Sequence, residues 1–258
     1  MQRIAVLHPE EVDLLCAFAG VPAPFPIKIR SRGATDEERR AGFAQARSRL
    51  QARGLAGHEG PRGVAADFVH LLRQGGGALD IVVAQRGKAS GAVVLAHRGD
   101  AVLVEQDMDR TNGAVRIMAL GVHDAVDGLL RHVPEHVVPM AAPFSVPREA
   151  LNRVHKAIMG AERLSADDLD RLRAAHGLDD QVARRMVTHL QPVLGNGQAG
   201  VAVRRGQAAE WVRSGDELRW LDSARGRFRL GDGEWMSVNP IGPEELRAEV
   251  RALAGELW

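Results

Sequence analysis

Two short motifs contain residue types and spacings that could support chemistry. The stretch HVPEH, residues 132–136, matches the H-x-x-E-H pattern of inverted zinc peptidases. Zinc binding in that pattern needs both histidines on one face of a continuous helix, and Pro134 would break a helix between them. We therefore interpret this stretch as a helix end followed by a linker. Zinc binding by the two histidines from a loop remains the alternative.

The stretch GNGQAG, residues 195–200, matches the G-x-G-x-x-G pattern of dinucleotide-binding loops. Such a loop follows a strand and opens a helix, so that the helix N-terminus meets the pyrophosphate. Here the order is reversed, because an amphipathic helical pattern precedes the glycines and a strand pattern follows them. The motif therefore predicts a helix C-cap and a loop, and no nucleotide site.

A third stretch, WLDSARGRFRL at residues 220–230, could be a basic patch or a β-hairpin. It holds three arginines that could bind phosphate, namely Arg225, Arg227 and Arg229. Alternation predicts a hairpin with a turn at 222–226, where Asp bonds nearby backbone and Gly takes a positive φ. Arg227 and Arg229 then lie on the solvent face, and Phe228 and Leu230 on the opposite face. The formal net charge of +1 makes nucleic-acid binding the weakest of the functional hypotheses.

The other titratable and nucleophilic residues form no recognisable catalytic pattern. Three aspartates flank predicted strands or turns, where Asp commonly bonds backbone: Asp80, Asp100 and Asp216. Cys16 lies in an apolar helical pattern and is interpreted as an inert buried thiol. We expect no catalytic residue, no cofactor and no metal. The alternative is an enzyme whose His and carboxylate side chains converge across two halves of the chain.

Four tryptophans lie in the last quarter of the sequence: Trp211, Trp220, Trp235 and Trp258. Trp220 and Trp235 fall in predicted strands, so we expect both in the core. A partner-binding surface is the alternative, because Trp is enriched at binding hot spots.

Composition predicts a globular protein outside the secretory pathway. The 258 residues are 45% hydrophobic and 26% charged, which suffices for a substantial core. A single cysteine cannot form an internal disulfide, and the first residues lack the pattern of a signal peptide. No apolar run approaches the roughly 20 residues that a membrane-spanning helix needs. We therefore expect a cytoplasmic protein without membrane insertion.

The sequence predicts two halves with the same order of elements, β-α-α-α-β-β-β-β-α. The predicted elements of the first half are a strand at 4–7, helices from Pro9, at 35–53 and around 64–72, strands at 79–85, 91–99, 101–106 and 114–120, and a helix at 122–132. Those of the second half are a strand at 144–146, helices from Pro147, at 166–176 and at 180–194, strands at 200–205, 217–223, 226–231 and 234–240, and a helix at 243–257. Short loops between the strands indicate antiparallel meanders, and the fold class is α+β.

The second half resembles the EspG family of ESX (type VII) secretion-associated proteins of actinobacteria. The resemblance is most specific at Trp220, Asp222, Ser223, Gly226, Arg227 and Phe228, which match a W-x-D-T/S-x-x-G-R-aromatic pattern. It extends through GQAGVAVRR at 197–205 and the stretch at 231–253, and the layout of the first half fits as well.

The resemblance implies a single EspG-like domain, residues 1–258, with quasi-two-fold halves at 1–138 and 139–258. These halves would surround a central antiparallel sheet flanked by helical bundles. It also implies a cytosolic, non-enzymatic chaperone that binds PE–PPE-like heterodimers at the tip of a helical bundle. No motif of the family marks single contact residues. The candidate client-binding segments are the helices at 166–176 and 180–194 and the strand at 200–205.

Overall fold

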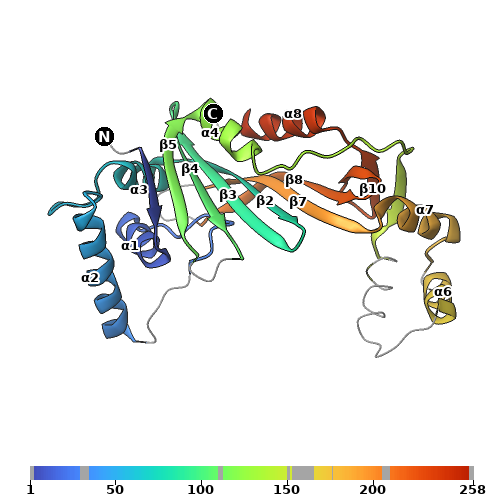
Figure 1. The fold of residues 1–258 in the computed structure, drawn as a ribbon, viewed down its shortest axis with the longest axis horizontal. Coiled ribbons are helices and arrows are strands. Elements are labelled where there is room, and N and C mark those ends of the chain that lie inside the picture. The colour runs from blue at the N-terminus through green and yellow to red at the C-terminus, as the bar shows by residue number, and fades with distance from the viewer. Residues whose placement is uncertain are drawn as a thin grey trace. The chain divides into compact units, whose positions relative to one another are not determined.

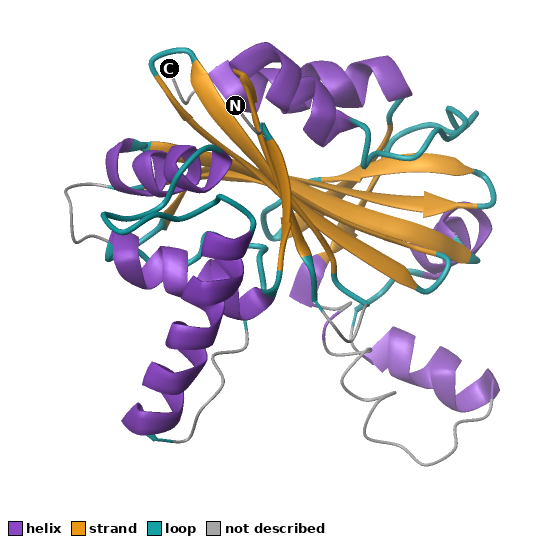
Figure 2. Ribbon diagram, turned by 60° about the vertical axis from the view of Figure 1, so that its left-hand side comes forward, coloured by secondary structure: helices purple, strands orange, loops and turns teal. Residues whose placement is uncertain are grey.

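The computed structural model is an α+β fold in which antiparallel strands pair along a ten-stranded sheet and helices pack beside them (Figures 1 and 2). It describes residues 3–29, 35–109, 113–149, 152, 166–175, 177–204 and 210–255. The first part of the chain forms β1 (Ile4–Leu7), α1 (Pro9–Ala19), α2 (Asp36–Ala52), α3 (Val64–Gln74), β2 (Gly77–Gln85), β3 (Lys88–His97), β4 (Asp100–Asp107), β5 (Val115–Gly121) and α4 (Val122–Leu130). The second part forms β6 (Phe144–Pro147), α6 (Ala166–Ala175), α7 (Asp180–Leu190), β7 (Val193–Val203), β8 (Val212–Ser223), β9 (Gly226–Leu230), β10 (Trp235–Pro240) and α8 (Pro243–Ala254).

The strand order along the sheet is β1-β5-β4-β3-β2-β7-β8-β9-β10-β6. Strands β2 to β5 form an antiparallel meander, in which Val94 lies opposite Leu79 of β2 and Leu103 of β4. Strand β1 adds to β5, with Ala5 opposite Ile117. The meander predicted from short loops is therefore confirmed.

Contacts between Cα atoms divide the chain into two compact units. Unit 1 comprises Met1–Pro134, Gln198–Glu217 and Ala248–Trp258, and unit 2 comprises Glu135–Gly197 and Leu218–Arg247. The long strands β7 and β8 each pass from one unit into the other, because their bounds cross these divisions.

Local hydrogen bonds define the N-termini of helices α2 and α1 in unit 1. Thr35 caps α2 by accepting a hydrogen bond from the Glu38 backbone N–H at 3.2 Å, as its capping box predicts. The helix α1 starts with Pro9, and the residue before it, His8, forms a reciprocal capping box with Glu11 that sequence reasoning missed. The prediction missed it because His is not among the preferred N-cap residues.

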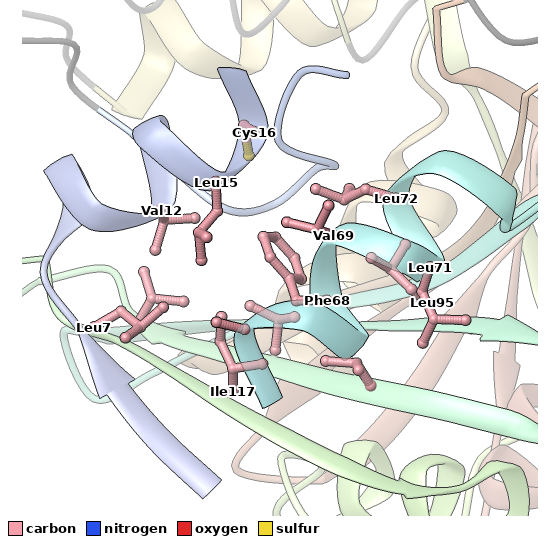
Figure 3. Close-up of a cluster of buried hydrophobic side chains, with 14 of the residues drawn as sticks. Leu7, Val12, Leu15, Cys16, Phe68, Val69, Leu71, Leu72, Leu95 and Ile117 are labelled. Carbon is pink, nitrogen blue, oxygen red and sulfur yellow. The ribbon is translucent and has the colours of Figure 1, made fainter. Parts of the chain in front are cut away.

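The core of unit 1 lies between the helices α1 and α3 and one face of strands β1 to β5. Figure 3 shows Val12 and Leu15 of α1 and Phe68 of α3 packed above Leu7 and Ile117 of the strands. All are buried, and truncating a buried Phe such as Phe68 to Ala typically costs about 3–5 kcal/mol.

Cys16 lies in this core, as predicted, and burial raises the pKa of its thiol to about 12.

The core of unit 2 lies between α7 and one face of strands β6, β9 and β10. Its buried members are Phe144, Val146, Leu178, Ala183, Leu190, Phe228 and Val238. The ring of His189 is tilted against both Phe144 and Phe228, at 6.2 Å between centroids in each case. The predicted amphipathic face of α7 is thus confirmed at Met186 and Leu190, which pack on this cluster.

Two predictions around the end of α7 are wrong. The helix ends at Leu190 and does not continue to residue 194, because the next-but-one residue is Pro192, which cannot extend a helix. The stretch GNGQAG is not a helix C-cap and loop, since residues 195–200 lie inside β7.

Some predictions lie outside the described residues. They include most of the helix that begins at Pro147, the capping residue Ser165 and Trp258. Among the described helices, none is long and apolar enough to cross a membrane.

Candidate functional site

The stretch that carries the sequence signature forms the β8–β9 hairpin of unit 2. Register places Asp222 directly opposite Arg227 and Ser223 opposite Gly226. Arg227 Nε donates to Asp222 Oδ1 at 2.6 Å and its Nη2 donates to Oδ2 at 2.8 Å, so the ion pair is bidentate. Both side chains are 1% exposed. Arg227 is therefore a core residue and not part of a solvent face, which corrects the sequence prediction.

The Arg227 guanidinium lies 5.9 Å from the centroid of the Trp220 ring, and the segment that follows α4 lies beside the start of β9. The Arg227 backbone N–H donates to the Val137 carbonyl at 3.2 Å, and Pro139 lies against Gly226. A Cβ on Gly226 would lie 2.7 Å from Pro139, and its φ of 137° also favours glycine. Of the three arginines, only Arg225 and Arg229 remain exposed, so the three do not form a phosphate-binding patch.

Two glycines in β7 let large side chains of β8 lie across that strand. The Trp220 indole lies over Gly197, where a Cβ would approach the ring to 2.0 Å. The Arg213 guanidinium lies over Gly200, where a Cβ would be 3.1 Å from Cζ. The glycines that resemble a nucleotide loop thus serve close packing inside the sheet.

Arg213 reaches over Gly200 to bind the buried carboxylate of Asp80 in β2. Its Nη2 donates to Asp80 Oδ1 at 2.9 Å, its Nη1 donates to Oδ2, and its Nε donates to Glu217 at 2.8 Å. Burial raises the pKa of Asp80 to about 6, although the bonds from Arg213 oppose that shift. Asp80 therefore ties β2 to β8, whereas the sequence had suggested that its carboxylate bonds nearby backbone.

The two histidines of HVPEH bind different groups. The ring nitrogens of His132 lie 3.2 Å from Ser90 Oγ and 3.0 Å from Glu105 Oε1 in unit 1. His136 Nε2 lies 2.8 Å from the Ser223 carbonyl in unit 2. Among the described residues, no group of three or more His, Cys, Asp or Glu could hold a metal ion.

The predicted client-binding segments fall in both units. The helices α6 and α7 belong to unit 2, whereas residues 200–203 of β7 belong to unit 1. Val187 of α7 is 61% exposed, and the start of β7 carries the exposed Val193 and Leu194. Val193 and Leu194 are consecutive in β7 and point to opposite faces of that strand, so the three side chains are separate candidate contacts within eight residues of sequence.

Unit 2 also holds other exposed apolar side chains. Seven of the twelve large hydrophobic side chains exposed among the described residues lie in this smaller unit: Val137, Val138, Met140, Val187, Val193, Leu194 and Trp235.

Trp220 is buried, as predicted, but Trp235 is 62% exposed, so its predicted core position is wrong. Trp235 lies on the opposite sheet face from Met236 and Val238, whose face packs on the core of unit 2.

Comparison with known proteins identifies the class. The sequence model of the EspG family matches residues 8–252, which is nearly the whole chain, so the chain belongs to the EspG family. None of the curated proteins compared with the chain is significantly similar to it in sequence.

The fold is similar to that of a solved structure, the type VII secretion system chaperone EspG5 of Mycobacterium tuberculosis in complex with a PE25–PPE41 dimer. The TM-score is 0.62 and the identity is 14%, and the match covers 99% of this chain and 97% of that chain.

Proposed function

We propose that this protein is a cytoplasmic chaperone of a type VII secretion system. Its clients would be helical-hairpin substrates such as PE–PPE-like heterodimers. The family match over residues 8–252 carries the proposal, and the similar fold of EspG5, which was solved with a PE25–PPE41 dimer, supports it.

The proposed mechanism is the masking of an apolar client tip. An exposed apolar tip on a helical client would self-associate, and a chaperone that covers it keeps the client monodisperse until export. Holding a client in this way needs no chemical step, no cofactor and no nucleic acid.

Unit 2 is the proposed client-binding part of the chain. Ala183 and Leu190 anchor α7 on the core of unit 2, and Val187 lies one turn from each of them, at the exposed edge of that anchored stripe. Val187 at that edge, and Val193 and Leu194 just after the helix, are exposed and available to pack against an apolar tip. Arg184, three residues before Val187 on the helix, is also exposed, which fits a polar rim beside an apolar centre.

The test is binding of a purified PE–PPE-like heterodimer by the purified chain and by two matched variants. Val187→Glu places a charge on the proposed surface, and Val212→Glu places one at an equally exposed position in unit 1, since the two valines are 61% and 62% exposed. We expect Val187→Glu to weaken binding more than tenfold, because a buried unpaired carboxylate adds to the lost apolar contact of about 1 kcal/mol. Val212→Glu should bind like the unmodified chain.

Equal affinities of the two variants would contradict the placement of the surface on α7. Failure of the unmodified chain to bind any such heterodimer encoded beside a type VII secretion system would contradict the function itself. Size-exclusion chromatography of the mixture distinguishes a bound client from a self-associated one.

We also propose that the domain, residues 1–258, consists of two pseudo-repeats, residues 1–138 and 139–258, arranged with quasi-two-fold symmetry and flanked by helical bundles. The strand order supports this, because it runs β1-β5-β4-β3-β2 from one edge and β6-β10-β9-β8-β7 from the other. Each element of one series corresponds to the element with the same rank in the other. An experimental structure whose two halves do not superpose would contradict the duplication.

A further inference from the structure

Unit 1 contains a cavity of about 640 Å³ whose lining includes a serine, a histidine and a glutamate. Ser90 comes from β3, Glu105 from β4 and His132 from the turn after α4. Arg86, Lys88 and Arg116 also line it, as does Asp107, so cationic side chains outnumber carboxylates in the lining. The chaperone function proposed above makes no use of these residues.

The sheet places Ser90 and Glu105 on the same face. Glu105 lies directly opposite Ala92, and Ser90 is two residues from Ala92 on the same strand, so the two side chains are diagonal neighbours. Leu103 shares this face with Glu105 and is covered by α4, where a Cβ on Gly128 would lie 2.5 Å from Leu103 Cδ2. This close approach brings the end of α4 down to the sheet.

His132 is held between the two strand residues. Its backbone N–H donates to the Leu129 carbonyl at 3.1 Å, which fixes it in a final helical turn. Its Nδ1 is 3.2 Å from Ser90 Oγ and its Nε2 is 3.0 Å from Glu105 Oε1. The carboxylate accepts only, so the ring proton belongs on Nε2, and Nδ1 is left to accept the Ser90 hydroxyl proton.

The environment supports an oriented and ionised carboxylate. The hydrogen bond from His132 is the main cause that lowers the pKa of Glu105 below its usual range, while partial burial opposes it. The side chains of His132 and Glu105 are 17% and 22% exposed, so they are shielded yet open to the cavity. A nucleophile within hydrogen-bond reach of a base, which a third group orients, is the geometry of an activated serine.

We propose that this cavity is a hydrolytic site for small carboxylic esters that carry negative charge. Ser90 is the nucleophile, His132 the general base and Glu105 the positioning residue. The nearby Arg86, Lys88 and Arg116 would attract an anionic ester. This activity goes beyond the chaperone function and does not depend on it.

The reaction is balanced by water alone. Ser90 Oγ attacks the ester carbonyl carbon while its proton passes to His132 Nδ1. The carbon–oxygen bond to the alcohol breaks, and the alcohol leaves with that proton. Water then attacks the acyl-serine and gives its proton to Nδ1, which returns it to Ser90 as the free acid departs.

The first experiment treats the purified full-length chain with a fluorophosphonate probe and locates the adduct by mass spectrometry. We expect the adduct on Ser90, and its loss in Ser90→Ala. Ser48→Ala is the matched control, because Ser48 is exposed on α2 and its hydroxyl donates to the Ala44 carbonyl of the same helix. Thermal unfolding of each variant establishes that it is folded.

The second experiment follows hydrolysis of mono-4-nitrophenyl succinate, an anionic activated ester, with neutral 4-nitrophenyl acetate as comparison. We expect His132→Asn to lower the rate on the succinate ester by at least 100-fold. We expect Glu105→Gln to shift the pH midpoint of the rate, which a purely structural role would not change.

An unmodified chain that gains no adduct on Ser90 overturns the proposal, and so does an unchanged hydrolysis rate in Ser90→Ala. In either case the cluster is only a tie between α4 and the sheet. Client binding by Ser90→Ala is measured in parallel, and because it does not involve the cavity, its outcome separates failure of this proposal from failure of the chaperone function.

Discussion

The buried ion pair between Asp222 and Arg227 provides the sharpest test of how the signature hairpin is stabilised. Asp222→Ala removes both acceptors of the bidentate pair, at 2.6 and 2.8 Å, and leaves a guanidinium that is 1% exposed without its counter-charge. Removing one partner of a buried pair typically costs about 3–5 kcal/mol. We expect a loss of that size in the free energy of unfolding.

The double variant Asp222→Val/Arg227→Met tests whether the lost stability comes from an unpaired buried charge or from changing these two side chains at all. It replaces both ions with apolar side chains, so no buried charge is left without a partner. We expect it to lose less than about 2 kcal/mol, and therefore to be more stable than Asp222→Ala.

The assay is urea unfolding followed by tryptophan fluorescence, because Arg227 Cζ lies 5.9 Å from the centroid of the buried Trp220 ring. With a denaturant slope of about 3 kcal/mol/M, the expected midpoint shift for Asp222→Ala is about 1–2 M. A shift below about 0.3 M, or a double variant as unstable as the single one, would refute the reasoning.

Two further predictions concern glycines and pH. Gly197→Ala should lower the free energy of unfolding by at least about 1–3 kcal/mol, because its Cβ would lie 2.0 Å from the Trp220 ring. In contrast, a Cβ added at Gly42 in α2 would meet no neighbouring atom within 4 Å outside its own helix backbone and chain neighbours. Gly42→Ala should therefore raise the free energy of unfolding by about 0.5–1 kcal/mol, and thermal unfolding compares the two variants. The lowered pKa of Glu105 means that its stabilising effect is present above its usual pKa of 4.5 and is lost as the pH falls through the lowered value. Glu105→Gln should therefore flatten the acid side of the stability–pH curve. The pH dependence that Asp80 contributes to stability has the opposite sign, because the pKa of Asp80 is raised from 3.8 to about 6. Its stabilising contribution is present below pH 3.8 and is lost as the pH rises through about 6. A stability–pH curve of Asp80→Asn with the same slope as the unmodified chain between these values would contradict this assignment.

Local patterns predicted most of the elements. Thr35 caps α2, and alternating apolar residues placed β2 to β5 within a few residues of their observed bounds. These signals depend on neighbours in the sequence, so the sequence alone suffices to detect them. The residues of the W-x-D-S signature likewise indicate the family from the sequence alone.

Burial at the hairpin could not be predicted in the same way. Alternation states which side chains share a face, but not whether another segment covers that face. Arg227 and Arg229 share one face of β9, yet Arg227 is 1% exposed and Arg229 is exposed. The same limitation explains why Trp235 was expected in the core and is exposed.

The two candidate sites likewise differ in how much of each the sequence predicts. The client-binding segments 166–176, 180–194 and 200–205 were proposed beside the family resemblance, no single contact residue was predicted, and these segments stay a prediction. The cluster of Ser90, Glu105 and His132 was not predicted, because the pairs are 42 and 27 residues apart and no spacing signal connects them.

The sequence alone therefore determined the elements, the α+β class and the resemblance to the EspG family, because these depend on local periodicity, capping and a short signature. The tertiary structure decided the roles of the glycines in β7, the burial of Arg227 and the meeting of Ser90, His132 and Glu105. These depend on strand register and on which segment covers which face. Pairing between distant strands sets both, and no window of the sequence contains that information.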